Sequence, residues 1–127
     1  MGLMNVLLGN ASEVDLNELQ KEFADILIDG EILEKAYSII RDKWVFTNKR
    51  LILLNVQGVT GSKREYLSIP YENISHFSIE TPGTLDDDCE LRIVIKGSAG
   101  FLKKEFSRKT DIKSLQKLLA SHILGAH

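Results

Sequence analysis

Residues 43–56, KWVFTNKRLILLNV, decide the fold of this chain. They predict two β-strands that meet at a turn over residues 47–50. Asn48 suits that turn because its short amide side chain tolerates positive φ better than most residues do. Apolar residues are consecutive on both sides of the turn, at 44–46 and 51–54, so we expect both faces of the hairpin to be covered. Such a hairpin is typical of the centre of a small barrel or sandwich.

Length and composition indicate a single globular domain. The chain has 127 residues, of which 43% are hydrophobic and 27% charged, and its net charge of −2 selects no class of partner. One cysteine, Cys89, excludes an internal disulfide and a multi-cysteine metal site. Residues 1–8 have neither a basic region nor a small-residue cleavage pattern, and the apolar runs are too short to span a bilayer. We therefore expect a cytoplasmic protein.

An amphipathic helix is predicted over residues 12–27, within an N-terminal helical segment of residues 1–29. Ser12 and Asp15 resemble a capping box in which Asp replaces the usual Glu or Gln. The residues that recur at helical spacing are Leu16, Leu19, Phe23, Ile26 and Leu27. For the apolar residues 1–8, three roles stay open: a short helical turn, an anchor on a membrane surface, or a tail packed on a neighbouring subunit.

Residues 30–127 have the pattern of an antiparallel β domain that ends in a helix. Short β-like runs are separated by turns rich in Gly, Pro, Asn and Asp. The predicted strands are residues 35–41, 43–47, 51–56, 63–69, 74–81, 90–96 and 101–107. An amphipathic helix follows, with Thr110 as its N-cap and Gly125 as its end. One such helix can close the open end of a small barrel made of two sheets, so the predicted fold class is mainly β.

Several segments of residues 30–96 carry a family resemblance. They are GE at 30–31, IRD at 40–42, FTNKRLIL at 46–53, QGVTGSK at 57–63, YLSIPY at 66–71 and FSIETPGTL at 77–85. These segments resemble the bacterial pleckstrin-homology (PH)-like domains, once catalogued as a family of unknown function. The resemblance implies the PH-like barrel, with seven antiparallel strands in two bent sheets capped by a C-terminal helix. It also implies a tendency toward ring-like homo-oligomers, and it implies no reaction.

The loop between the first two predicted strands departs from that of the lipid-binding eukaryotic relatives. Those relatives grip inositol phosphates with a basic loop at this place, whereas here the predicted loop is only Asp42 and Lys43. So short a turn cannot enclose a polyphosphate headgroup. The phosphoinositide role is therefore not carried over to this chain.

Charge is distributed unevenly along the chain. Residues 13–34 hold eight acids and one base, residues 43–64 hold five bases and no acid, and residues 80–90 hold five acids and no base. Complementary patches on two copies would pair head to tail, and a repeated contact of this kind can close into a ring. The simpler interpretation is that these charges lie on solvated loop tips. The candidate contacts between copies are Lys43, Lys49, Arg50, Lys63, Arg64, Asp86, Asp87 and Asp88.

No metal or phosphate motif is present. The acidic run at 86–88 lacks the spacing, the glycine and the distal glutamate of an EF-hand loop. The segment 58–63, GVTGSK, has two residues between its glycines where a phosphate-binding loop needs four, so it is interpreted as a turn. No spacing places two of the histidines on one face as zinc ligands. These histidines are His76, which we expect to face solvent, His122 and His127.

The sequence offers no catalytic group. Cys89 lies between Asp88 and Glu90, which raise the pKa of its thiol and suppress its reactivity, and no serine has a nucleophile-elbow pattern. We predict that the chain is not an enzyme and has no cofactor. A nucleic-acid surface would combine bases with aromatic residues. Its members would be Lys103, Lys104, Arg108 and Lys109 with Phe101 and Phe106. Because both phenylalanines are more simply core residues and the chain is acidic, no nucleic-acid partner is predicted.

The sequence therefore predicts a non-catalytic PH-like interaction module that self-assembles into a homo-oligomer, with another protein as a further partner. Val45, Ile52 and Leu54 leave more apolar strand surface than one terminal helix covers, so a neighbouring subunit or the N-terminal helix must cover the rest. The alternative is a peripheral membrane module that binds anionic lipid through the apolar N-terminus and a basic hairpin. The basic residues of that alternative are Lys49, Arg50, Lys63 and Arg64.

Overall fold

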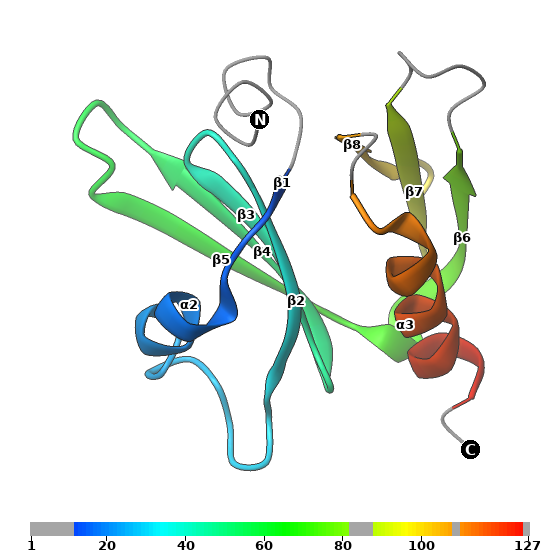
Figure 1. The fold of residues 1–127 in the computed structure, drawn as a ribbon, viewed down its shortest axis with the longest axis horizontal. Coiled ribbons are helices and arrows are strands. Elements are labelled where there is room, and N and C mark those ends of the chain that lie inside the picture. The colour runs from blue at the N-terminus through cyan, green and yellow to red at the C-terminus, as the bar shows by residue number, and fades with distance from the viewer. Residues whose placement is uncertain (1–11, 82–87, 108–109, 126–127) are drawn as a thin grey trace.

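The structure, a computed structural model, describes residues 12–81, 88–107 and 110–125. Its strands form two antiparallel sheets (Figure 1). The large sheet contains, in spatial order, β1 (Ser12–Glu13), β2 (Leu33–Ile39), β3 (Asp42–Thr47), β4 (Arg50–Gln57) and β5 (Lys63–Pro70). The small sheet contains β6 (Ile74–Glu80), β7 (Cys89–Ile95) and β8 (Leu102–Phe106). The helical elements are α2 (Leu16–Glu22), the 3₁₀ turn η1 (Tyr71–Asn73) and α3 (Ile112–Leu124).

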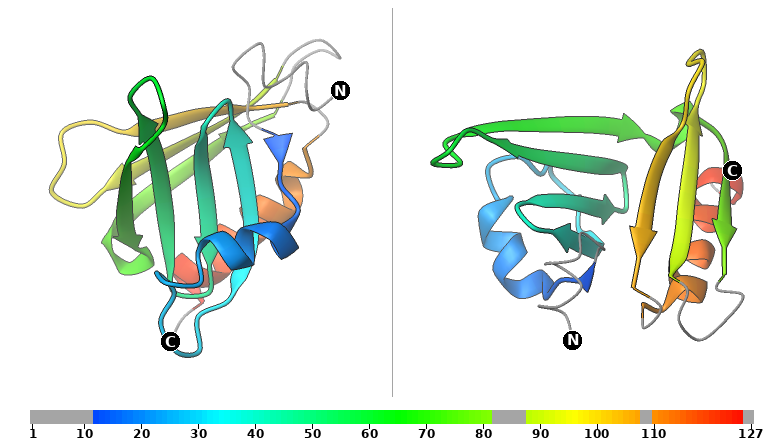
Figure 2. Two further views of the ribbon diagram at one scale, coloured as in Figure 1. Left: turned by 90° about the vertical axis from the view of Figure 1, so that its left-hand side faces the viewer. Right: turned by 90° about the horizontal axis from the view of Figure 1, so that it is seen from above.

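All seven predicted strands are present, with ends shifted by one or two residues, and β1 is an additional strand. The predicted fold class is confirmed: a mainly β fold of two antiparallel sheets with a C-terminal helix. Within the described residues the two sheets form separate ladders and do not close into one hydrogen-bonded barrel. Figure 2 shows the strands of the large sheet running across those of the small sheet.

The first hairpin turn lies earlier than expected. Strand β2 ends at Ile39, and the turn consists of Ile40 and Arg41, because Asp42 and the residues after it already pair in β3. Ile40 has a φ of 55°, so the positive φ expected at Asn48 occurs here instead. A β-branched side chain rarely adopts this conformation. The turn is as short as the sequence indicates, but its residues differ.

The turn between β3 and β4 is built by side chains. Thr47 Oγ1 accepts hydrogen bonds from the backbone N–H groups of Lys49 and Arg50, at 3.0 and 2.9 Å. Asn48 Oδ1 accepts from Ile32 N at 2.8 Å, and its amide donates to Gly30 O at 3.0 Å. Asn48 therefore fastens the preceding loop to the hairpin, whereas its expected role was to adopt a strained turn conformation.

The N-terminal helix is much shorter than the predicted range of residues 12–27. Helix α2 has 7 residues and its N-cap is Asp15, whose side chain accepts from Asn17 N at 2.9 Å. Ser12 is not the cap, because it pairs with Ser38 of β2. At the other end the helix stops at Phe23. The prediction of one long helix is therefore wrong, although an amphipathic helix is present.

The main core lies between the two sheets and under α3. Aromatic residues of the large sheet, including Tyr37, Trp44 and Phe46, pack with residues of the small sheet and with the apolar face of α3.

The N-cap of α3 is Asp111, which accepts from Ser114 N at 3.2 Å, so the prediction of Thr110 as the N-cap is wrong.

A second core covers the opposite face of the large sheet. Val45, Ile52 and Leu54 are buried there against Leu19 and Phe23. Strand alternation sends them to this face while their sequence neighbours enter the main core. The apolar surface of Val45, Ile52 and Leu54 is therefore covered by the N-terminal helix and not by a neighbouring subunit. This surface gives no separate reason for self-assembly.

Candidate functional site

Glu31 anchors a buried hydrogen-bond network at the end of the large sheet where β3 turns into β4. Its carboxylate forms a bidentate ion pair with Arg50, from Nε to Oε2 at 2.8 Å and from Nη2 to Oε1 at 2.9 Å. Thr47 Oγ1 donates to Glu31 Oε2 at 2.7 Å, and Ile28 N donates to Oε1 at 3.0 Å. The Glu31 side chain is fully buried, whereas that of Arg50 is 20% exposed. All of these contacts hold the loop that follows α2 against the hairpin.

The electrostatics of Glu31 reflect two opposing effects. Burial raises the pKa of the carboxyl group, but its hydrogen bonds to Arg50, Thr47 and the backbone at Ile28 outweigh burial, so the pKa lies below its ordinary value. Glu31 therefore stays ionised at neutral pH. The network is structural. It includes Arg50, which the sequence analysis assigned to contacts between copies.

Three of the five candidate basic residues form ion pairs within the chain. Arg50 pairs with Glu31, while Lys43 and Arg64 both pair with Glu22 of α2, at 3.9 and 3.0 Å. These pairs draw α2 onto the large sheet. A basic surface for a second copy or for lipid is correspondingly smaller than the sequence indicates.

The remaining candidate charges do not form one patch. Lys49 and Lys63 are exposed at opposite ends of the β4–β5 hairpin. Lys63 pairs with Gln57, eight residues after Lys49, so the two lysines lie roughly 26 Å apart along the strand at a rise of about 3.3 Å per residue. Asp88 is half-buried just before β7. Asp86 and Asp87 lie outside the described residues.

Strand β5 is the outer strand of the large sheet and has one open edge. Over 8 residues it pairs only with β4 within the described part of the chain. Six of its residues are exposed, and they include the large apolar residue Leu67, which is 44% exposed. An exposed edge of this length can accept a further strand, because its outward N–H and C=O groups have no strand partner.

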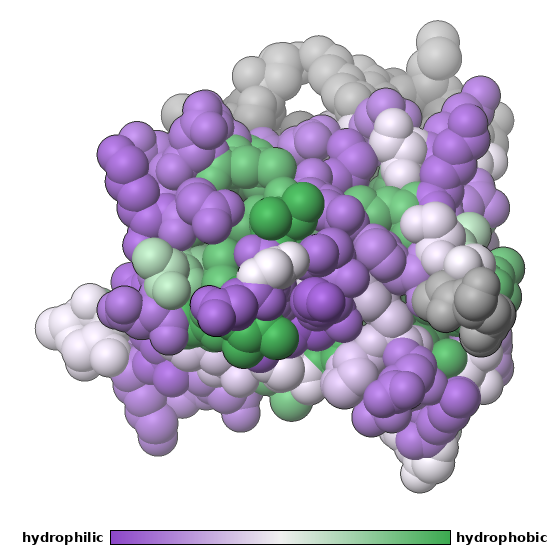
Figure 3. Space-filling model, turned by 90° about the horizontal axis from the view of Figure 1, so that it is seen from below, coloured by the Kyte–Doolittle hydropathy of each residue, from purple (hydrophilic) through white to green (hydrophobic). Residues whose placement is uncertain are grey.

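Two exposed apolar residues lie on the loop that follows α2, at the end of the large sheet where β5 ends. Ile28 and Ile32 are 60% and 56% exposed. Arg50 connects the loop to β5, since its guanidinium donates both to Ile26 O at 2.9 Å and to Ser68 Oγ at 2.8 Å. Figure 3 views the end of the molecule at which the loop lies, and apolar side chains gather there on the side of the large sheet. We call the open edge of β5, with the exposed Leu67 near its middle, the β5 margin.

The sequence did not identify the β5 margin. The strand itself was predicted, but strand order is not visible in a single sequence. The available signal was the run of charged residues at 63–65, which is typical of a solvent-exposed strand.

The cysteine and histidine side chains among the described residues are Cys89, His76 and His122. Cys89 is buried, and burial, followed by the nearby charge of Asp88, raises the pKa of its thiol. His76 is exposed, as expected. His122 contacts Glu34 Oε1 through Nε2 at 2.6 Å and stacks on Tyr71 with ring centroids 4.5 Å apart, which joins α3 to the large sheet. The described ranges contain no group of three or more His, Cys, Asp or Glu side chains placed to hold a metal ion.

The residues considered for nucleic acid are dispersed. Phe106 is buried in the core as expected, but Phe101 is 55% exposed beneath the guanidinium of Arg92, so its assignment to the core is wrong. Lys103 faces solvent and Lys104 faces the space between the sheets. Arg108 and Lys109 lie outside the described residues.

Within the described residues, neither helix has the length and apolar content needed to cross a bilayer.

Comparisons with known proteins agree with this architecture. The family model described as bacterial PH domain matches residues 2–123. The uncharacterised protein YjqA of Bacillus subtilis is 48% identical over 122 residues, which cover 95% of this chain and 98% of YjqA. A DUF1696 family protein with a pleckstrin-homology domain from Shewanella loihica is similar in structure, with a TM-score of 0.83 and 51% identity over 91% of this chain and 99% of its own. A pleckstrin homology domain from Shewanella amazonensis has a TM-score of 0.71 and 52% identity over 98% and 100% of the two chains.

Proposed function

This chain belongs to the bacterial PH domain family, and from that premise we propose that it is a non-catalytic interaction module that self-assembles through the β5 margin. The observation that carries the proposal is the open edge of β5, which is long and exposed and carries the exposed apolar residue Leu67. A strand from a second copy would satisfy the outward backbone groups of β5, while Leu67 would be removed from water.

The position of the edge determines how copies can join. Pro70 ends β5 and has no N–H to donate, and Lys63 and Arg64 place charge at its start. Pairing is therefore favoured along the middle of the strand, around Leu67. If β5 meets a different edge of the next copy, the contact is heterologous and closes into a ring when its rotation permits.

Charge complementarity has a smaller part in this proposal than in the sequence-based hypothesis. The ion pairs of Lys43, Arg50 and Arg64 within the chain leave fewer charges for a neighbour. We therefore expect the assembly to resist salt, because apolar contacts and backbone hydrogen bonds are screened little compared with exposed ion pairs. The same pairs weaken the case for an anionic lipid surface.

Replacing Leu67 by lysine is expected to convert the assembly to a monomer. The charge would have to be buried at the centre of the β5 margin, and an edge lysine is a common means of preventing strand addition. The measurement is the molar mass by light scattering after size exclusion. Val59→Lys is the matched control, because Val59 is fully exposed at the loop between β4 and β5, away from the middle of the strand. An unchanged mass for the folded Leu67→Lys protein would exclude the β5 margin as the interface.

A further inference from the structure

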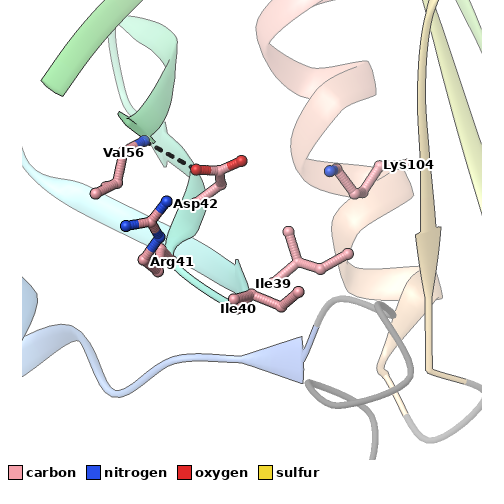
Figure 4. A pocket seen from close by; sticks show the side chains of 6 residues that line it. All are labelled: Ile39, Ile40, Arg41, Asp42, Val56 and Lys104. Carbon is pink, nitrogen blue, oxygen red and sulfur yellow. Dashed lines mark hydrogen bonds between the residues drawn. The ribbon is translucent and has the colours of Figure 1, made fainter. Parts of the chain in front are cut away.

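A hollow opens between the two sheets at the end where β2 turns into β3. Its volume is about 350 Å³, and its walls are formed by Ile39, Ile40, Arg41, Asp42 and Val56 from the large sheet and by Lys104 from the small sheet (Figure 4). This volume is enough for a small metabolite. The hollow is separate from the β5 margin and from the Glu31 network.

Lys104 supplies a cation that faces the hollow. Lys104 is in β8, where it pairs with Leu91 of β7 on the face of the small sheet that enters the core. Its Nζ lies 5.4 Å from the centroid of the Trp44 ring. Burial lowers the pKa of this amine, and the charge of Asp42 opposes that effect. Within the described residues, Lys104 Nζ has no hydrogen-bond acceptor and no carboxylate oxygen within ion-pair distance. A half-buried ammonium that lies over an aromatic ring and has no hydrogen-bond acceptor among the described residues can bind an anionic group.

Asp42 supplies an anion on the opposite wall. Its Oδ1 accepts a hydrogen bond from Val56 N at 2.9 Å, which fixes the carboxylate, while Oδ2 accepts none from the described residues. Figure 4 shows Asp42 and Lys104 facing each other across the hollow. The hollow therefore presents a carboxylate and an ammonium group on opposing walls, with the Arg41 guanidinium as a second cation beside the carboxylate.

The floor of the hollow is apolar and strained. Ile39 and Ile40 lie beneath the two charges in Figure 4. Ile40 holds a φ of 55° and is 66% exposed, so an isoleucine occupies a strained turn without the benefit of full burial. A two-residue hairpin turn needs a positive φ at its first residue, and strain of this kind is also commonly kept at ligand clamps. Arg41 fixes the turn by donating to Gly58 O at 2.7 Å.

We infer that this hollow binds a small zwitterion of the amino-acid class with an aliphatic side chain. The carboxylate of the ligand accepts hydrogen bonds from Lys104 Nζ, its ammonium donates to Asp42 Oδ2, and its side chain packs on Ile39 and Ile40. Each charge of the ligand then meets a side chain of opposite charge. The inference stands apart from self-assembly, since neither wall uses a residue of the β5 margin.

The test is a titration of the full chain, isotopically labelled for NMR, with L-leucine. Isocaproate, which lacks the amine, and isoamylamine, which lacks the carboxylate, serve as matched ligands. We expect leucine to shift the amide signals of Ile40, Asp42 and Lys104, and to bind at least about tenfold more tightly than either analogue, because each loses one charge-assisted hydrogen bond. Isocaproate binding as tightly as leucine would overturn the inference, as would the absence of shifts around the hollow.

Two variants assign the charges. Lys104→Met is expected to weaken leucine binding at least about tenfold, whereas Lys103→Met, which changes the neighbouring lysine on the solvent face, leaves it unchanged. Asp42→Asn keeps an oxygen for Val56 N and is expected to abolish the preference for leucine over isocaproate. Equal weakening by Lys103→Met and Lys104→Met would show that general charge, and not the hollow, attracts the ligand.

Discussion

Replacing Phe23 by alanine is expected to lower the free energy of unfolding by about 3–5 kcal/mol, the range for removing a large aromatic side chain from a core. Phe23 is fully buried and packs between α2 and the outer face of the large sheet, with its ring edge-on to Tyr66 at 5.7 Å between centroids. The short helix has few other buried residues, so its docking depends on this side chain. Chemical denaturation followed by fluorescence measures the change.

Phe101→Ala is the matched control for this prediction. Phe101 is 55% exposed and its main contact is with Arg92, so its loss is expected to cost less than about 1 kcal/mol. Similar costs for the two variants would show that α2 contributes little to the fold. The outer face of the large sheet would then be available to a neighbouring subunit after all.

Replacing Arg50 by methionine is expected to destabilise the protein by about 3 kcal/mol at neutral pH. Methionine keeps much of the apolar volume but leaves the Glu31 carboxylate buried without its counter-ion, and removing one partner of a buried pair costs about 3–5 kcal/mol. We expect the lower part of that range because Arg50 remains partly exposed. The measurement is again the free energy of unfolding, compared with that of Lys43→Met, whose looser pair with Glu22 at 3.9 Å should contribute less than about 1 kcal/mol.

The pH dependence distinguishes lost charge pairing from lost packing at Arg50. Because the pKa of Glu31 is lowered in the folded wild type, its ionisation contributes stability above the unfolded pKa of about 4.3, and this contribution is lost as pH falls through the folded pKa. In the Arg50→Met protein the unpaired carboxyl group gains a proton more readily. The difference between wild type and variant should therefore narrow on acidification. A difference that stays constant with pH would indicate a packing effect.

Much of the fold could be predicted because strand patterns are local. In β7, buried Leu91 and Ile93 alternate with Glu90 and Arg92, and that alternation alone identifies the strand and its inner face. The N-terminal helix was overestimated because distant residues decide its ends. Ser12 is drawn into pairing with β2, and the end of the helical pattern is held by contacts from Arg50.

The candidate site was less predictable for the same physical reason. The sequence shows that residues 43–64 are basic, but it does not show that Glu22 and Glu31 lie within reach of three of those bases. Nor does it show which strand ends the large sheet. The facing charges of Asp42 and Lys104 are 62 positions apart in the sequence (104 − 42 = 62), and only the folded chain brings them to one hollow.

The most direct test of self-assembly is the molar mass of the wild-type protein in solution, measured by light scattering after size exclusion at low and at high salt. We expect a mass several times the 14.3 kDa of one chain at both salt concentrations, because the β5 margin joins copies through backbone hydrogen bonds and apolar contacts. A mass that is large only at low salt would assign the interface to charged patches. A mass of one chain under both conditions would contradict self-assembly.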